Sequence, residues 1–207
     1  MRLLLKEIRY RLPLILISVA IFEVCWFINS NYEMLEYNYY LLPIVACGLL
    51  LGSKDEIELI RASKTRISNI MLIRYVITYL FLTLYPVLRL LTITEASNSW
   101  RLVLSFVISL LFATSISLLF RVIFNNPFGI IIYSALIHLL IASTFQYLLS
   151  KIVSDYQMVR RITPYGAHAI KDIGLFVNNR LLVSGMALII ITISYLIMRY
   201  RKSNIFM

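Results

Sequence analysis

Two charged side chains interrupt apolar stretches of the sequence, where they could meet inside a membrane. Glu23 lies five residues before the end of the apolar run Pro13–Ile28, and Arg89 lies two residues before the end of the run Ile70–Leu91. Both runs are expected to cross in the same direction, so the two side chains should lie at similar depth. An ion pair there would lower the cost of each charge in the membrane. The alternative is that each side chain extends separately to the interface.

His138 lies near the middle of a third apolar run, Pro127–Leu149. An ionisable side chain at that depth is a candidate for function. A hydrogen bond to a neighbouring helix is the interpretation we favour.

Small side chains recur at every fourth position of the run Leu102–Phe120: Ser105, Ser109, Ala113 and Ser117. This spacing places them on one helical face, where they let another helix approach closely. The stripe is therefore predicted to be a packing seam, with the polar lining of a substrate path as the alternative.

The sequence lacks the motifs that carry catalysis. It contains no GxxxxGK[ST], HExxH or GxSxG pattern and no paired carboxylates inside an apolar run. Cys25 and Cys47 both lie in apolar stretches, which favours two buried thiols over a metal site or a disulfide. We therefore predict that the chain is not an enzyme and binds no cofactor, and that any ATP is bound by another chain.

Composition indicates a membrane protein. Of the 207 residues, 60% are hydrophobic and 14% are charged, against about 25% charged residues in soluble domains. The net charge is +10, but the basic residues lie beside apolar runs. There they set membrane orientation and contact anionic lipid rather than nucleic acid.

We predict an all-α integral membrane protein, with residues 1–207 forming a single transmembrane domain of six transmembrane helices. The expected spans are Pro13–Ile28, Tyr37–Leu51, Ile70–Leu91, Leu102–Phe120, Pro127–Leu149 and Leu181–Met198. With the N-terminus inside, 13 of the 20 basic residues fall on the inner side. That bias predicts a multi-pass protein of the cell membrane with both termini cytoplasmic.

Three further segments are predicted to lie outside the spans. Residues 1–12 form an amphipathic interfacial helix that turns into the bilayer at Pro13. Residues 53–66 begin with the capping-box pattern Ser53-Lys54-Asp55-Glu56 and form a short cytoplasmic helix. Residues 150–180 carry five basic residues on the outer side and form one or two short helices.

The stretch Glu58-Leu59-Ile60-Arg61-Ala62-Ser63-Lys64-Thr65-Arg66 resembles the E-x-L-L-x-x-S-P-x-S/T-R segment of type 2 ABC-transporter permeases. In that family the segment forms the coupling helix, which contacts the ATPase subunit. Ser63 and Arg66 match the pattern, while Lys64 replaces its proline. The resemblance implies that Glu58, Arg61, Ser63, Lys64, Thr65 and Arg66 contact an ATPase.

The stretch Ile162–Ile170 is similar to the N-P-L-x-x-A-I/L-E segment of the same family, which belongs to an outer re-entrant helical element. Pro164 and His168 fall within it. The family's Gly-x-x-x-P-x-x-x-L-P pattern is absent.

The resemblance implies the membrane subunit of an ABC exporter. Its partners would be cytoplasmic ATPase chains, which bind ATP and Mg, a second permease copy, and membrane lipid. The substrate would be an amphipathic peptide, such as an antimicrobial peptide, a drug or a lipid, and residue usage suggests a bacterial source. Two alternatives stay open: an immunity or binding protein that works without an ATPase, and a membrane peptidase with a Cys/His pair.

Overall fold

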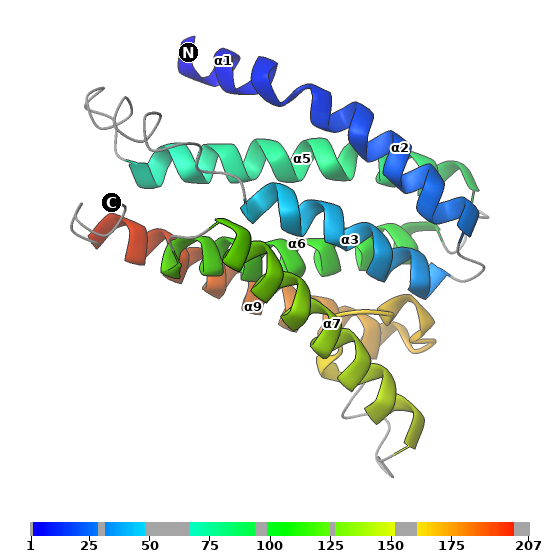
Figure 1. The fold of residues 1–207 in the computed structure, drawn as a ribbon. Helices are drawn as coiled ribbons and strands as arrows, with labels where there is room; N and C mark the ends of the chain where they lie inside the picture. The colour runs from blue at the N-terminus through cyan, green and yellow to red at the C-terminus, as the bar shows by residue number, and fades with distance from the viewer. Residues whose placement is uncertain are drawn as a thin grey trace.

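The computed structural model of this protein describes residues 2–28, 32–48, 67–93, 99–124, 127–151 and 161–200 (Figure 1). These residues form helices and contain no strand, which confirms the all-helical class. The helices are α1 (Arg2–Arg11), α2 (Pro13–Ile28), α3 (Tyr32–Gly48), α5 (Ile67–Ile93), α6 (Ser99–Ile123), α7 (Pro127–Lys151) and α9 (Ile173–Tyr200), with one 3-10 turn, η1 (Ala167–Ala169).

Four helices are long and apolar enough to cross a membrane: Glu7–Ile28, Ile67–Thr92, Trp100–Ile123 and Ile173–Tyr200. Two further apolar helices, Asn38–Cys47 and Ile131–Ile141, are shorter. The chain is therefore a membrane protein with four candidate spans. The six-span arrangement requires α3 and α7 to cross as well, and it stays a prediction.

Helix α6 occupies the middle of the bundle and packs against α3, α5, α7 and α9, while α2 packs mainly on α5 (Figure 1). The start of α5 lies near α1 and near the C-terminal part of α9. Arg74 of α5 pairs with Glu7 of α1, and Asn69 of α5 accepts a hydrogen bond from Tyr195 of α9. We call this the terminal end of the bundle. The opposite end, which carries residues 161–172, is called the loop end.

Aromatic side chains fill the core between α2, α3 and α6. The ring of Phe22 lies 5.3 Å from that of Tyr39 and 6.1 Å from that of Phe106, both edge-on. Large apolar side chains on α2, α5, α7 and α9 instead point outward and are exposed. An apolar exterior around a partly polar interior is the arrangement expected in lipid.

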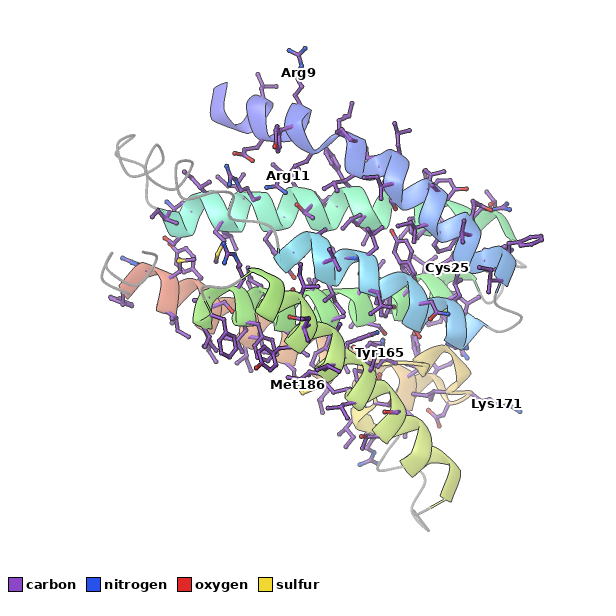
Figure 2. All side chains as sticks on the ribbon, viewed as in Figure 1. Arg9, Arg11, Cys25, Tyr165, Lys171 and Met186 are labelled. Carbon is purple, nitrogen blue, oxygen red and sulfur yellow. The ribbon has the colours of Figure 1, made fainter. Side chains whose placement is uncertain are left out.

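Helix α1 ends at Arg11, one residue before the predicted end at residue 12, and α2 begins at Pro13, whose missing N–H is tolerated at the first helical position. Arg74 donates two hydrogen bonds to Glu7, of 3.0 Å and 2.8 Å, and the pair is buried. Figure 2 shows Arg11 pointing toward α5 and Arg9 pointing away from the bundle. The polar face of α1 thus contacts α5, and the expected location of α1 at the membrane interface stays a prediction.

Pro86 lies inside α5 and cannot donate a backbone hydrogen bond to the carbonyl of Leu82, four residues earlier. Two side chains from other helices compensate. The hydroxyl of Tyr39 in α3 donates to the Leu82 carbonyl at 2.5 Å, and Ser18 Oγ of α2 lies 3.3 Å from the same oxygen. Such compensation is what allows proline inside a membrane helix.

Helix α9 begins at Ile173, eight residues before the predicted start of the last span at Leu181. Its first turn is capped by Asp172, whose Oδ1 accepts a 2.8 Å hydrogen bond from the Leu175 N–H. The predicted segment 150–180 is therefore wrong at its C-terminal boundary, because residues 173–180 belong to α9. The predicted coupling segment 53–66 lies outside the described residues.

Candidate functional site: a buried arginine at the loop end

Arg180 lies in the interior of the bundle, with 2% of the residue exposed. Phe176, Arg180, Val183 and Ala187 are all buried and follow one another at intervals of four, three and four residues. This spacing places them on one face of α9, which faces α6. A guanidinium group thus occupies a position that the helical pattern would otherwise give to an apolar side chain.

Hydrogen-bond acceptors from three parts of the chain surround this guanidinium. Nη1 donates to Ser109 Oγ at 3.0 Å and to the Ser105 carbonyl at 3.2 Å, both on α6. Nη2 donates to the Thr163 carbonyl at 3.1 Å, and Nε donates to Asn179 Oδ1 at 2.7 Å. These bonds compensate for the loss of water around the buried charge.

The same bonds hold residues 163–166 between α3, α6 and α9. Asn179 Nδ2 donates to the Thr163 carbonyl at 2.9 Å, and Ser109 Oγ donates to the Pro164 carbonyl at 2.6 Å. Gly166 has φ 68°, a left-handed conformation that glycine adopts without strain. Its N–H donates to Glu36 Oε2 of α3 at 3.0 Å.

Glu36 is fully buried, and its carboxyl group interacts electrostatically with Arg180. Its Oε1 lies 2.7 Å from the hydroxyl of Tyr40, one turn further along α3. The Tyr40 hydroxyl also lies 2.9 Å from the Phe106 carbonyl of α6. We call Glu36, Ser109, residues 163–166, Asn179 and Arg180 the Arg180 cluster.

His138 joins this cluster through Tyr165. Its Nδ1 lies 2.8 Å from the Tyr165 hydroxyl, and the two rings stand edge to face. Figure 2 labels Tyr165 where residues 161–172 meet α3 and α7. His138 therefore forms a hydrogen bond to another element, but its partner lies in a non-helical segment and not in a neighbouring helix, as the sequence had favoured.

The stripe of small residues on α6 is buried along its length. Ser109 contacts the Pro164 carbonyl, and Ser117 Oγ donates to the Ile44 carbonyl of α3 at 2.8 Å. Both hydroxyls thus bond across to other elements, as a packing seam requires.

Glu23 and Arg89 lie together on the α2–α5 side. Arg89 Nε donates to Glu23 Oε1 at 2.9 Å, and the Tyr85 hydroxyl donates to the same oxygen. The structure therefore forms the ion pair, the first of the two alternatives for these residues.

Other predicted residues lie near the cluster or beyond the description. Pro164 is buried in the cluster, and His168 lies in η1 and is half-buried. The six predicted coupling residues, Glu58, Arg61, Ser63, Lys64, Thr65 and Arg66, lie outside the described residues, so their role stays a prediction.

Three important residues were not identified from the sequence. These residues are Arg180, Glu36 and Arg74; the predicted outer segment 150–180 includes Arg180 only as one of its five basic residues. The helical spacing of Arg180 with Phe176 and Val183 was a usable signal. Glu36 precedes Tyr39 and Tyr40 on one face of α3 and gave a weaker signal.

The polar groups of the Arg180 cluster are suited to holding several elements of the bundle together. Within the described part of the chain, no group of three or more His, Cys, Asp or Glu residues could hold a metal ion. The cluster instead connects α3, α6, α9 and a non-helical segment through charge-assisted hydrogen bonds, which are stronger than neutral ones.

No protein-family model, curated protein or solved structure matches this chain.

Proposed function

We propose that the chain is the membrane-spanning permease subunit of an ABC exporter. A separate ATPase chain would bind ATP and Mg, and this chain would move an amphipathic peptide, drug or lipid outward across the cell membrane. A second permease copy, identical or related, would complete the substrate path between the two subunits.

The observation that carries this proposal is the clamped segment at the loop end. Residues 162–170 resemble the re-entrant element of type 2 permeases, and they lie folded against the bundle just before its last helix. A polar segment held by Glu36 and Arg180 is suited to serve as a gate, since its bonds can be broken and remade. The position of α1 and of the last described turns of α9 near the start of α5 is also consistent with an even number of spans.

Helix α5 would transmit motion from the ATPase. It begins at Ile67, directly after the proposed coupling helix 53–66. Near its start it is bonded to α1 through Arg74 and Glu7, and near its other end it is bonded to α2 through Arg89 and Glu23. Because α5 is bonded to α1 near one end and to α2 near the other, a push on the coupling helix would move the three helices together. The ATPase then needs only to bias two arrangements of similar free energy.

The test is recovery of a working complex from the native membrane. We expect the tagged chain to co-purify with an ABC ATPase whose ATP turnover depends on the permease. The double change Glu58→Ala with Arg61→Ala should release that ATPase, since truncating one member of a desolvated polar contact costs about 2–5 kcal/mol. Membrane yield should be unchanged.

A change at Arg9, which points away from the bundle, supplies the control: Arg9→Ala should keep the ATPase bound. If the double variant retains both the ATPase and normal turnover, the coupling assignment is wrong. If the wild-type chain copurifies with no ATPase but protects cells against a peptide toxin, the immunity or binding alternative is favoured instead.

A further inference from the structure

The ion pair between Glu23 and Arg89 occupies an unusual place for two charges. Their side chains are 37% and 38% exposed, on a surface where the neighbouring large side chains are apolar. Val24 and Phe27 of α2 and Leu88 of α5 are all exposed. Both helices are candidate membrane spans, so this surface faces lipid.

The pair leaves hydrogen-bonding capacity unused. Glu23 Oε1 accepts from both the Tyr85 hydroxyl and Arg89 Nε. Within residues 2–28, 67–93 and the other described ranges, no hydrogen bond is formed by Arg89 Nη1 or Nη2 or by Glu23 Oε2. Two N–H-bearing nitrogens of a permanent cation on a partly exposed side chain therefore need acceptors from outside the described residues.

The depth of Arg89 in the membrane indicates which part of the lipid supplies those acceptors. Helix α5 has 27 residues and is about 40 Å long, at about 1.5 Å per residue. A hydrocarbon core of about 30 Å leaves about 5 Å of the helix beyond each boundary. Arg89 lies four residues before Ile93, or about 6 Å from the helix end. Its guanidinium therefore reaches the level of the lipid headgroups.

We propose that Arg89 binds the phosphate of a phospholipid headgroup in the leaflet that surrounds the Ile28 and Ile93 ends of α2 and α5. A guanidinium binds phosphate through two parallel N–H bonds, and Nη1 and Nη2 remain for that purpose. Glu23 orients the guanidinium through Nε, and Tyr85 fixes Glu23. The acyl chains lie along the exposed side chains of Val24, Phe27 and Leu88.

This geometry predicts that the two charges have opposite effects on the affinity for the lipid phosphate. Arg89 attracts the phosphate, whereas Glu23 repels it. The amide oxygen of Glu23→Gln can still accept the bonds from Tyr85 and Arg89, so this variant should keep the guanidinium in place while removing the repulsion. If the pair served only to hold α2 against α5, removing the two charges would not change lipid affinity in opposite directions.

The test is native mass spectrometry of the full chain in detergent, titrated with dioleoylphosphatidylglycerol and with phosphate-free dioleoyl diglucosyldiacylglycerol. We expect the wild type to bind the phospholipid more tightly than the glycolipid. Arg89→Gln should weaken phospholipid binding about tenfold, and Glu23→Gln should tighten it about threefold. Arg101→Gln is the control, because Arg101 lies at the same end but contacts Trp100 and the Lys171 carbonyl, and it should leave the affinity within about twofold.

Equal binding of the two lipids, or equal loss in Arg89→Gln and Arg101→Gln, would overturn the proposal. So would a change in oligomeric state of Arg89→Gln with unchanged lipid affinity, which would assign the pair to contact with a second copy. If Arg89→Gln loses its helical circular dichroism, the Glu23→Gln titration decides alone: tighter binding supports the phosphate site, and unchanged or weaker binding refutes it.

Discussion

Nη1 of Arg180 donates a 3.0 Å hydrogen bond to Oγ of Ser109, and that hydroxyl donates in turn to the Pro164 carbonyl at 2.6 Å. One serine on α6 thereby connects the last helix to the segment that precedes it. The bond from the guanidinium polarises the hydroxyl, which strengthens the bond to Pro164. The position of residues 163–166 thus depends on the charge of a residue in α9.

Arg180→Lys should destabilise the protein although it keeps the charge. A lysine ammonium has three donors and no planar fork, so it cannot reach acceptors on α6, α9 and the segment together. We expect a loss of about 2–4 kcal/mol in the free energy of unfolding, measured by reversible denaturation in mixed micelles. Arg199→Lys, at an exposed position of the same helix, is the control, and a similar small loss in both variants would contradict the clamp.

Glu36→Gln should loosen the segment without unfolding the bundle. The amide oxygen is a weaker acceptor than a carboxylate oxygen, so its bond to the Gly166 N–H should be weaker, and the amide cannot carry a negative charge toward Arg180. Amide hydrogen exchange at residues 166–170 should become about tenfold faster, in line with the loss of a charged hydrogen bond. Exchange in α5 should not change. Unaltered exchange at Gly166 would show that Glu36 does not hold the segment.

Tyr39→Phe and Pro86→Ala should be thermodynamically coupled. In the wild type, removal of the Tyr39 hydroxyl takes a donor from the Leu82 carbonyl and should cost about 1–2 kcal/mol of stability. In Pro86→Ala, the restored backbone N–H can bond that carbonyl, so the same removal should cost about half as much. A double-mutant cycle measures the difference, and strictly additive costs would refute the compensation.

Cysteine labelling should place Arg9 and His168 on opposite sides of the membrane. Arg9 lies in α1 near the start of α5, at the terminal end, and His168 lies in η1 at the loop end. In a chain with Cys25 and Cys47 replaced by alanine, we expect Arg9→Cys to react only after the membrane is permeabilised. His168→Cys should react with an impermeant maleimide in intact cells. Labelling of both from one side would exclude the predicted topology.

Apolar runs predicted the long helices well. The expected spans Ile70–Leu91 and Leu102–Phe120 lie inside α5 (Ile67–Ile93) and α6 (Ser99–Ile123). Hydropathy locates such helices because a lipid-facing or buried helix must be apolar along most of its length. The depth argument for Glu23 and Arg89 succeeded for the same reason, since helical rise alone sets relative depth.

Buried charges could not be located in this way. In a hydropathy profile a charged residue such as Arg180 marks the end of an apolar run, so the last span was predicted to begin at Leu181. That prediction missed the first eight residues of α9. Three of its acceptors are backbone carbonyls, those of Ser105, Thr163 and Pro164. Every residue carries a carbonyl, and a sequence does not show which ones remain available after folding.

The Leu82 carbonyl bears on how the protein is assembled in the cell. Helix α5 inserted alone would expose that oxygen to lipid without a donor, whereas Ser18 and Tyr39 belong to helices that are synthesised earlier. When α5 leaves the translocation machinery, α2 and α3 are already available to receive it. The order of the helices along the chain thus matches the order in which their polar groups are needed. A circular permutation that placed α2 and α3 after α5 would delay their synthesis and favour degradation of the nascent protein.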